Sequence, residues 1–203
     1  MTERTRILLV RHGQTDWNRE RRIQGWGASS LTRRGREQAR ALGRHLAATY
    51  DIDRVVASDL RRTRETAALL RDAGVEPEPT FQRAWRERDF GRLQGLTVEE
   101  LFGGYPEYAA TSGAVAIDAE PPGGERLRDA YERVIDGWEQ LCTDADGETV
   151  LVVTHGGPIY FVLGDVRGQD VLTAVLDHSQ ENCAVNELRV GETVEVVRQN
   201  ETV

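Results

Sequence analysis

The chain alternates between short apolar runs and longer amphipathic segments. Three continuous aliphatic runs predict strands that are buried on both faces, at residues 7–10, 55–57 and 149–153. Between them, apolar residues recur every three or four positions, which predicts helices over residues 32–50, from residue 58 or 59 to about 74, over 127–141 and from about 158. Two further strands are predicted at residues 185–188 and 193–197.

Buried strands that alternate with helices are typical of the α/β class. We therefore predict a three-layer α/β/α sandwich with a mostly parallel central sheet, in which residues 1–203 form a single domain. Thr97 and Glu100 have the spacing of a helix capping box, and residues 103–124 are rich in Gly, Pro and small side chains. These features predict a lid-like, irregular insertion over about residues 97–124.

The composition and charge of the chain argue against some classes of binding partner. The net charge is −8, and all 26 basic residues are arginine. A negative chain is a poor match for nucleic acid, and no apolar run reaches the roughly 20 residues of a membrane helix. The polar N-terminus and only two cysteines, Cys142 and Cys183, favour a cytoplasmic protein with reduced thiols. Nothing in the sequence determines the oligomeric state.

Polar motifs follow three of the predicted buried strands. They are Arg11-His12-Gly13, the segment 58–62, and His155-Gly156-Gly157. The carboxyl ends of parallel strands lie at one edge of a sheet, where α/β proteins bind their ligands. We therefore expect these three motifs to form one site.

The residue types at this edge suit a phosphoryl group. Guanidinium groups bind phosphoryl oxygens in a bidentate manner, and a neutral imidazole can attack phosphorus. Hydrolysis also needs a group that protonates the departing alcohol. Glu87 and Asp89 are candidates for that acid, and their spacing alone does not choose between them.

Six motifs occur in order along most of the chain, at residues 11–18, 22–25, 58–62, 87–91, 122–125 and 153–157. Together they resemble the histidine phosphatase superfamily, in the branch that holds cofactor-dependent phosphoglycerate mutases and related phosphatases. The resemblance implies a phosphoglycerate mutase-like fold. Arg126 stands where a serine is common in this family, which puts the local contact of Glu125 in doubt.

The resemblance also implies a role for each motif. His12 would be the nucleophile, and Glu87 rather than Asp89 would be the acid and base. The phosphoryl oxygens would be held by Arg11, Arg62 and His155. The path of the substrate would be lined by Asn18, Gln24 and Gly25, and Gly156 would offer its backbone. Neither a metal ion nor another cofactor is implied.

These roles predict a metal-independent phosphatase that acts on small phosphorylated metabolites through a phosphohistidine. Two alternatives are a cofactor-dependent phosphoglycerate mutase and a catalytically silent relative that binds phosphorylated ligands. Residues 103–124 contain no basic side chain, and their only charges are Glu107, Asp118 and Glu120. We expect such an acidic lid to repel a second phosphate, which favours hydrolysis over mutase activity.

Overall fold

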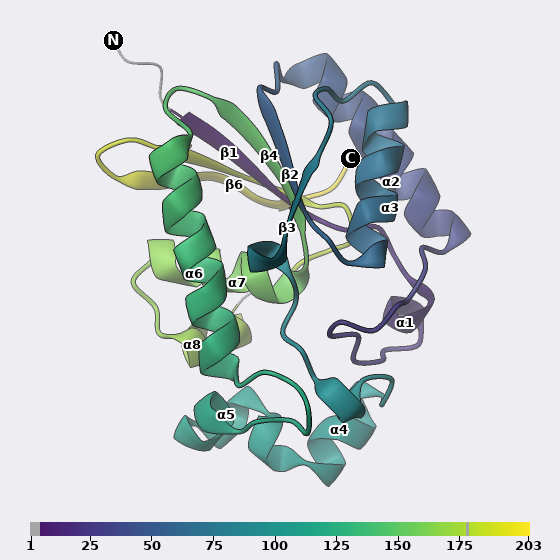
Figure 1. The fold of residues 1–203 in the computed structure, drawn as a ribbon, viewed down its shortest axis with the longest axis vertical. Coiled ribbons are helices and arrows are strands. Elements are labelled where there is room, and N and C mark those ends of the chain that lie inside the picture. The colour runs from purple at the N-terminus through teal and green to yellow at the C-terminus, as the bar shows by residue number, and fades with distance from the viewer. Residues whose placement is uncertain (1–4, 178) are drawn as a thin grey trace.

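A computed structural model describes residues 5–177 and 179–203. His178, for which the sequence predicts no role, and positions 1–4 of the predicted domain lie outside the described residues. The strands form one six-stranded sheet in the order β3-β2-β4-β1-β5-β6 (Figure 1). Their bounds are β1 Thr5–Arg11, β2 Arg54–Ser58, β3 Thr80–Gln82, β4 Thr149–Thr154, β5 Val185–Val190 and β6 Val194–Glu201.

The strand directions confirm the predicted mostly parallel sheet. β1, β4, β2 and β3 pair in parallel, whereas β5 runs antiparallel to β1 and β6 antiparallel to β5. In the register, Arg11 lies opposite Thr154, and Ala57 lies opposite Val153. The residues that follow β1, β2 and β4 therefore emerge at the same edge.

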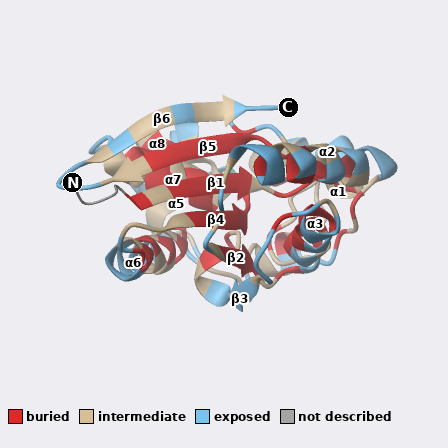
Figure 2. Cartoon of the chain, turned by 90° about the horizontal axis from the view of Figure 1, so that it is seen from above, coloured by how far each residue is buried: buried red, intermediate tan, exposed pale blue. Residues whose placement is uncertain are grey.

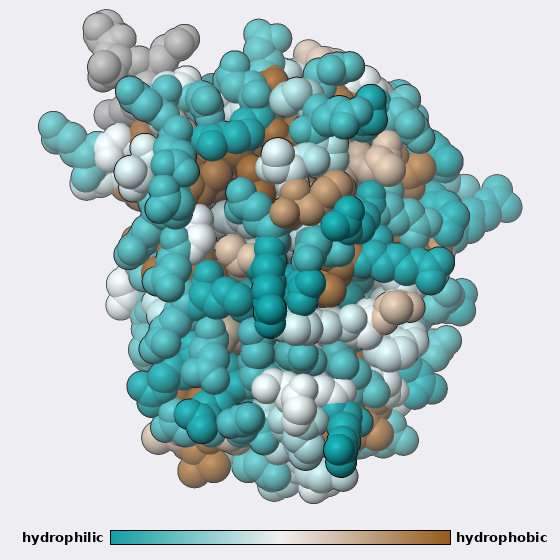
Figure 3. Space-filling view, viewed as in Figure 1, coloured by the Kyte–Doolittle hydropathy of each residue, from teal (hydrophilic) through white to brown (hydrophobic). Residues whose placement is uncertain are grey.

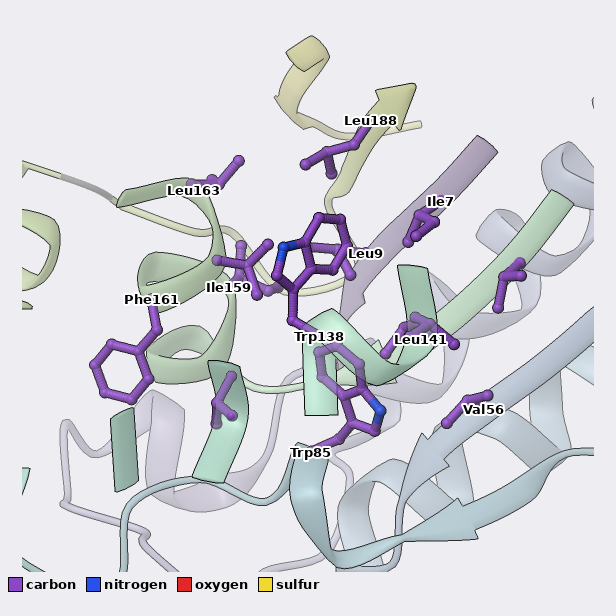
Figure 4. Close-up of a cluster of buried hydrophobic side chains, with 14 of the residues drawn as sticks. Ile7, Leu9, Val56, Trp85, Trp138, Leu141, Ile159, Phe161, Leu163 and Leu188 are labelled. Carbon is purple, nitrogen blue, oxygen red and sulfur yellow. The ribbon is translucent and has the colours of Figure 1, made fainter. Parts of the chain in front are cut away.

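Both faces of the sheet are covered, which explains the continuous apolar runs. On β1, Ile7 and Leu9 belong to one buried cluster, and Leu8 and Val10 belong to another. The first cluster is completed by α6 (Leu127–Asp144) and α7 (Gly156–Val166), and Trp85 and Trp138 lie within it (Figure 4). The second is completed by α2 (Arg33–Thr49) and α3 (Arg61–Asp72). Buried positions accordingly line the strands and the inner helix faces (Figure 2).

Some elements differ from the sequence prediction. The predicted loop before residue 30 contains a short helix, α1 (Asp16–Arg19), in which Thr15 and Asn18 form a capping box. The edge strand β3 was not predicted because all three of its residues are exposed and leave no burial pattern. α3 begins at Arg61, since Ser58 still belongs to β2, and α7 begins at Gly156 rather than near Pro158. Near the end of the chain, α8 spans Val171–Asp177.

The segment 97–124 begins with the helix that its capping box predicts, and residues 103–124, predicted to be irregular, contain further short helical turns. The capping box of Thr97 and Glu100 is formed and starts α4 (Val98–Gly104). Single 3₁₀ turns at Pro106–Tyr108 and Ala110–Ser112 lead to α5 (Ala114–Asp118). This segment forms the lower end of the molecule in Figure 1.

On the face shown in Figure 3, hydrophilic residues predominate and hydrophobic residues appear only in separate patches. None of the helices in the described part of the chain has the length and apolar character needed to cross a membrane. Cys142 and Cys183 are both free thiols.

Candidate active site

His12 follows β1 and is almost fully buried, with 2% of its surface exposed. Its Nδ1 lies 2.8 Å from the carbonyl oxygen of Gly13. Because that oxygen can only accept, Nδ1 carries the proton of the neutral ring, and Nε2 keeps its lone pair. The peptide N–H of Gly13 donates to Thr66 Oγ1 at 3.1 Å, which fixes the turn that carries the imidazole. The nitrogen that is free to react therefore faces the site.

Arg62 lies between the two site histidines. Its Nε is 3.2 Å from His12 Nε2 and 3.1 Å from His155 Nδ1. Its Nη2 donates to the carbonyl of Gly25 at 2.8 Å, and its Nη1 donates to that of Gly27 at 3.3 Å. Arg62 is 1% exposed, whereas the neighbouring Arg61 is exposed to solvent. The structure thus brings the arginine chosen by the family motif to the histidines.

His155 is held from its other side by Ser58. Its Nε2 lies 2.8 Å from Ser58 Oγ, and both residues are fully buried. Since Nδ1 accepts from Arg62, Nε2 carries the proton and donates to Ser58. The sequence predicted that a helix starts at residue 58 or 59, but the residue at the N-cap of α3 is Leu60, which makes no side-chain capping bond. Ser58 instead fixes the orientation and tautomer of His155.

Burial and neighbouring cations keep both imidazoles neutral. Burial lowers the pKa of His12 well below its ordinary value, and the charges of Arg62 and Arg11 lower it further. The pKa of His155 is lowered in the same way, first by burial and then by Arg62. Burial also lowers the pKa of Arg62, to about 10, so its guanidinium stays charged at neutral pH. The site therefore holds concentrated positive charge next to an unprotonated nucleophile.

Arg11 adds a second cation at the end of β1. Its Nη1 donates to the carbonyl of Gln180, while its buried Nε has no hydrogen-bond partner among the described residues. The nearby Asn182 donates from Nδ2 to the carbonyl of His12 at 3.0 Å and to Asn18 Oδ1 at 3.3 Å. Sequence reasoning missed Asn182, because it lies far along the chain and outside the family motifs.

Glu87 enters the same pocket from the loop before α4. Its two carboxylate oxygens accept from the peptide N–H groups of Arg88, at 3.0 Å, and Gly157, at 3.2 Å. A Cβ at position 157 would lie 2.2 Å from Glu87 Oε1, so this close approach requires glycine there. Asp89 points elsewhere, and its Oδ1 accepts from the N–H of Gly91 at 2.8 Å.

Hydrogen bonds from Arg133, a residue of α6, hold the loop that carries Glu87; we call this network, with its partner Glu125, the brace. Arg133 donates to the backbone carbonyls of Arg83, Ala84, Arg86 and Glu87, at 2.8 to 3.3 Å. The same guanidinium forms a bidentate pair with Glu125, at 2.8 and 3.0 Å.

Glu125 completes this brace by accepting from the N–H of Asp89 at 3.1 Å. The doubt that Arg126 raised about Glu125 was therefore misplaced, because the contacts of Glu125 do not involve the side chain at position 126. Trp26 adds a further bond, from Nε1 to the Glu87 carbonyl at 2.7 Å. The backbone around Glu87 is thus fixed by side chains from three distant segments.

The other predicted residues surround one cavity of about 260 Å³. Asn18, Gln24 and Gly25 line it together with Arg11, His12, Arg62 and Glu87. Asn18 and Gln24 are held by Thr15, whose hydroxyl lies 3.0 Å from the side-chain oxygen of each. His155, which lies behind Arg62, and Gly156 do not line the cavity themselves; Gly157, the next residue of α7, does. Among the residues that the structure describes, no three His, Cys, Asp or Glu side chains form a group that could hold a metal ion.

A neutral imidazole, two guanidinium groups and a carboxylate around one cavity form a set that can accept and release a phosphoryl group. The sequence profile of the histidine phosphatase superfamily (branch 1) matches residues 7–202. The chain therefore belongs to this superfamily.

Its relatives include proteins named as phosphoglycerate mutases and proteins named as phosphatases. The chain is 36% identical over 163 residues to the 2,3-bisphosphoglycerate-dependent phosphoglycerate mutase 2 of Gloeobacter violaceus, covering 77% of this chain and 73% of the relative. It is 38% identical over 157 residues to the metal-independent phosphoserine phosphatase of Arabidopsis thaliana, covering 77% and 66%. Among solved structures, YhfR of Bacillus stearothermophilus has a TM-score of 0.86 and 30% identity over 98% of both chains.

We expect the imidazoles of His12 and His155 to stay neutral in the free protein when the pH falls through 6.5, the ordinary histidine pKa. Burial and the adjacent guanidinium groups disfavour the charged ring. Side-chain ¹⁵N shifts measured by NMR, with His12→Gln and His155→Gln to assign the signals, report the protonation state. A titration midpoint at or above 6.5 for either ring would contradict this expectation.

The same lowered pKa values link pH to stability. Below pH 6.5 the unfolded chain binds protons on these histidines that the folded protein does not bind. Their contribution to the free energy of unfolding is therefore present above pH 6.5 and is lost as the pH falls below it.

Proposed function

We propose that the protein is a metal-independent phosphomonoesterase that acts on small phosphorylated metabolites through a phosphohistidine on His12. One observation carries the proposal: His12 Nε2 is an unprotonated nitrogen of a residue that lines the cavity, with the guanidinium groups of Arg62 and Arg11 beside it. A cytoplasmic location is part of the same proposal, supported by the two free thiols.

In the first step, Nε2 of His12 attacks phosphorus and the bond from phosphorus to the ester oxygen breaks. Glu87, in its protonated form, gives its proton to the departing alcohol. In the free protein Arg62 Nε donates a hydrogen bond to His12; when substrate is bound, it donates to a phosphoryl oxygen instead. Arg11 donates to another phosphoryl oxygen from Nε, which has no partner among the described residues of the free protein. When the negatively charged group binds, His155 Nδ1 takes up a proton from solvent and donates to the phosphoryl group; it returns that proton to solvent when phosphate leaves.

In the second step, water attacks phosphorus and Glu87 takes its proton. The bond between phosphorus and Nε2 breaks, and inorganic phosphate leaves. Glu87 thus ends the cycle protonated and His12 ends it neutral, as both began. The N–H groups of Arg88 and Gly157 keep the carboxylate in place through both steps.

The predicted reason for hydrolysis has to be corrected. Asp118 pairs with Arg128 at 2.8 Å and Glu120 with Arg126 at 3.2 Å. Together with Glu107, these acids line a separate hollow, and none of the three lines the cavity of the site. They do not face the site, so their charge is not what disfavours a second phosphate. Hydrolysis is supported instead by the apolar side chains that this segment contributes to the cavity.

Phosphoglycerate mutase activity is the second candidate, because two further arginines line the cavity. Arg22 and Arg88 lie in its wall, although neither belongs to the segment 97–124. Both are already engaged: Arg22 donates to Glu20 and to the carbonyl of Gly95, and Arg88 donates to the carbonyls of Ala119 and Glu125. The nitrogens that could bind a bisphosphate are those that these bonds leave unused, Nη2 of Arg22 and Nη1 of Arg88.

We expect His12→Ala to lower phosphate release from p-nitrophenyl phosphate by at least about 1,000-fold, as for other covalent nucleophiles. The assay is run in EDTA, where the wild type should keep its activity. Rapid quenching with ³²P-labelled substrate should trap an acid-labile phosphoenzyme in the wild type only. Activity that survives His12→Ala refutes the nucleophile, and collapse in EDTA with recovery on adding a divalent ion refutes the metal-free reaction.

Glu87→Gln should lower the rate of hydrolysis of an alkyl phosphate by about 10²–10⁴-fold. The rate with p-nitrophenyl phosphate should fall much less, because a good leaving group departs without a proton. Asp89→Asn is the matched control. It removes the neighbouring carboxylate, which lies outside the cavity, and keeps an oxygen that can accept from Gly91. Equal losses with both substrates would show that Glu87 is only structural.

Phosphatase and mutase activities are separated by one measurement with 3-phosphoglycerate. With 2,3-bisphosphoglycerate present, we expect phosphate release to exceed the formation of 2-phosphoglycerate, since the segment 97–124 provides no cation to retain the intermediate. Enzymatic assay of phosphate and ³¹P NMR of the two isomers give both rates. Faster interconversion than release would make the mutase the correct assignment.

A further inference from the structure

The cavity has two chemically different ends. One end holds His12, Arg11, Arg62 and Glu87, which the proposed function uses. The other is lined by aromatic and aliphatic side chains from five separated parts of the chain: Phe90, Phe102, Tyr108, Leu127, Phe161 and Val175. The chain has only four phenylalanines, and three of them line this cavity. We refer to this end as the apolar chamber.

Two cations, Arg22 and Arg88, also line the cavity, and both already donate to other groups of the protein. Arg22 forms an ion pair with Glu20 at 2.8 Å. Arg88 donates 3.0 Å hydrogen bonds to two carbonyls, and its guanidinium lies 4.9 Å from the ring centre of Phe90. The segment 97–124 contributes Phe102, Tyr108 and Ala110 to the wall, and its acids face away.

We infer that the preferred substrates are phosphomonoesters of compact apolar alcohols or phenols, with the apolar group held in this chamber. The inference rests on the proposed function and deepens it. Apolar surface gains by leaving water for such a wall, whereas a carboxylate or hydroxyl loses its hydration against the phenylalanine and aliphatic side chains. A cavity of about 260 Å³ suits one small ring rather than a large conjugate.

Two pairs of esters test this preference at nearly constant shape. In the first pair, 4-methylphenyl phosphate should exceed 4-carboxyphenyl phosphate in kcat/KM by about 10-fold or more. The carboxyphenol is the better leaving group, so chemistry alone predicts the opposite order. In the second pair, propyl phosphate should exceed glycerol 1-phosphate, which has the same three-carbon skeleton with two hydroxyls. Equal rates or the reverse order in the first pair overturn the inference.

A matched pair of variants locates the effect in the chamber. Ala110→Arg places a cation in the wall and should reduce the preference for the methyl ester about 10-fold, by improving the carboxy ester and impairing the methyl ester. Val115→Arg makes a similar change in the same segment, but at a side chain that is 60% exposed and outside the cavity. It should leave the preference unchanged. An unchanged preference in Ala110→Arg overturns the inference.

Phe102→Ser provides a second variant that adds no charge. It should lower kcat/KM for 4-methylphenyl phosphate more than for glycerol 1-phosphate, and equal losses would count against the chamber. In each variant, inhibition by inorganic phosphate should stay at the wild-type level, which shows that the polar end is intact.

Binding without turnover separates this inference from the proposed function. Calorimetry should show that the wild type binds 4-methylbenzylphosphonate more tightly than 4-carboxybenzylphosphonate, by about 10-fold. If the protein hydrolyses no ester but still discriminates between the phosphonates, the proposed function fails and the chamber stands. If it hydrolyses esters through His12 without any discrimination, the chamber fails and the proposed function stands.

Discussion

The arrangement of the site depends on one buried guanidinium. Arg62 donates from a single Nε to both His12 and His155, and its other two nitrogens donate to the carbonyls of Gly25 and Gly27. A buried cation without such partners would be very unfavourable. Here the four acceptors hold it at the centre of the site, and its charge adds to the effect of burial in lowering the pKa of both imidazoles. The same contact therefore orients the histidines and keeps them neutral.

Glu87 illustrates how a carboxylate is held without a countercharge in direct contact. Among the residues that the structure describes, its oxygens accept only from peptide N–H groups, one of them from Gly157 at the start of α7. The backbone of its loop is braced by Arg133, which Glu125 in turn holds. This network leaves the carboxylate facing the cavity, where the proposed reaction needs a proton to be given and later taken back.

We propose that the two ends of the cavity recognise different parts of the substrate. The polar end lies at the carboxyl edge of the sheet and recognises what all phosphomonoesters share. The apolar chamber is formed by residues outside the sheet, from the loop at Phe90, the segment 97–124 and helices α6 to α8. Such a division lets specificity change in the surrounding segments while β1, β2 and β4 keep the phosphoryl site unchanged.

The sequence by itself determined the fold class and the motifs at the three strand ends, because buried strands and paired helices leave strong hydrophobic patterns and because these motifs are short and local. It missed β3, whose exposed residues leave no such pattern. It also misjudged Ser58, and the direction of the acids in the segment 97–124. Tertiary structure alone decided that Ser58 fixes His155, that Asn182 joins His12 to Asn18, and that Phe102 and Phe161 share one wall. These contacts join residues 59 to 170 positions apart, and only the packed chain brings them together.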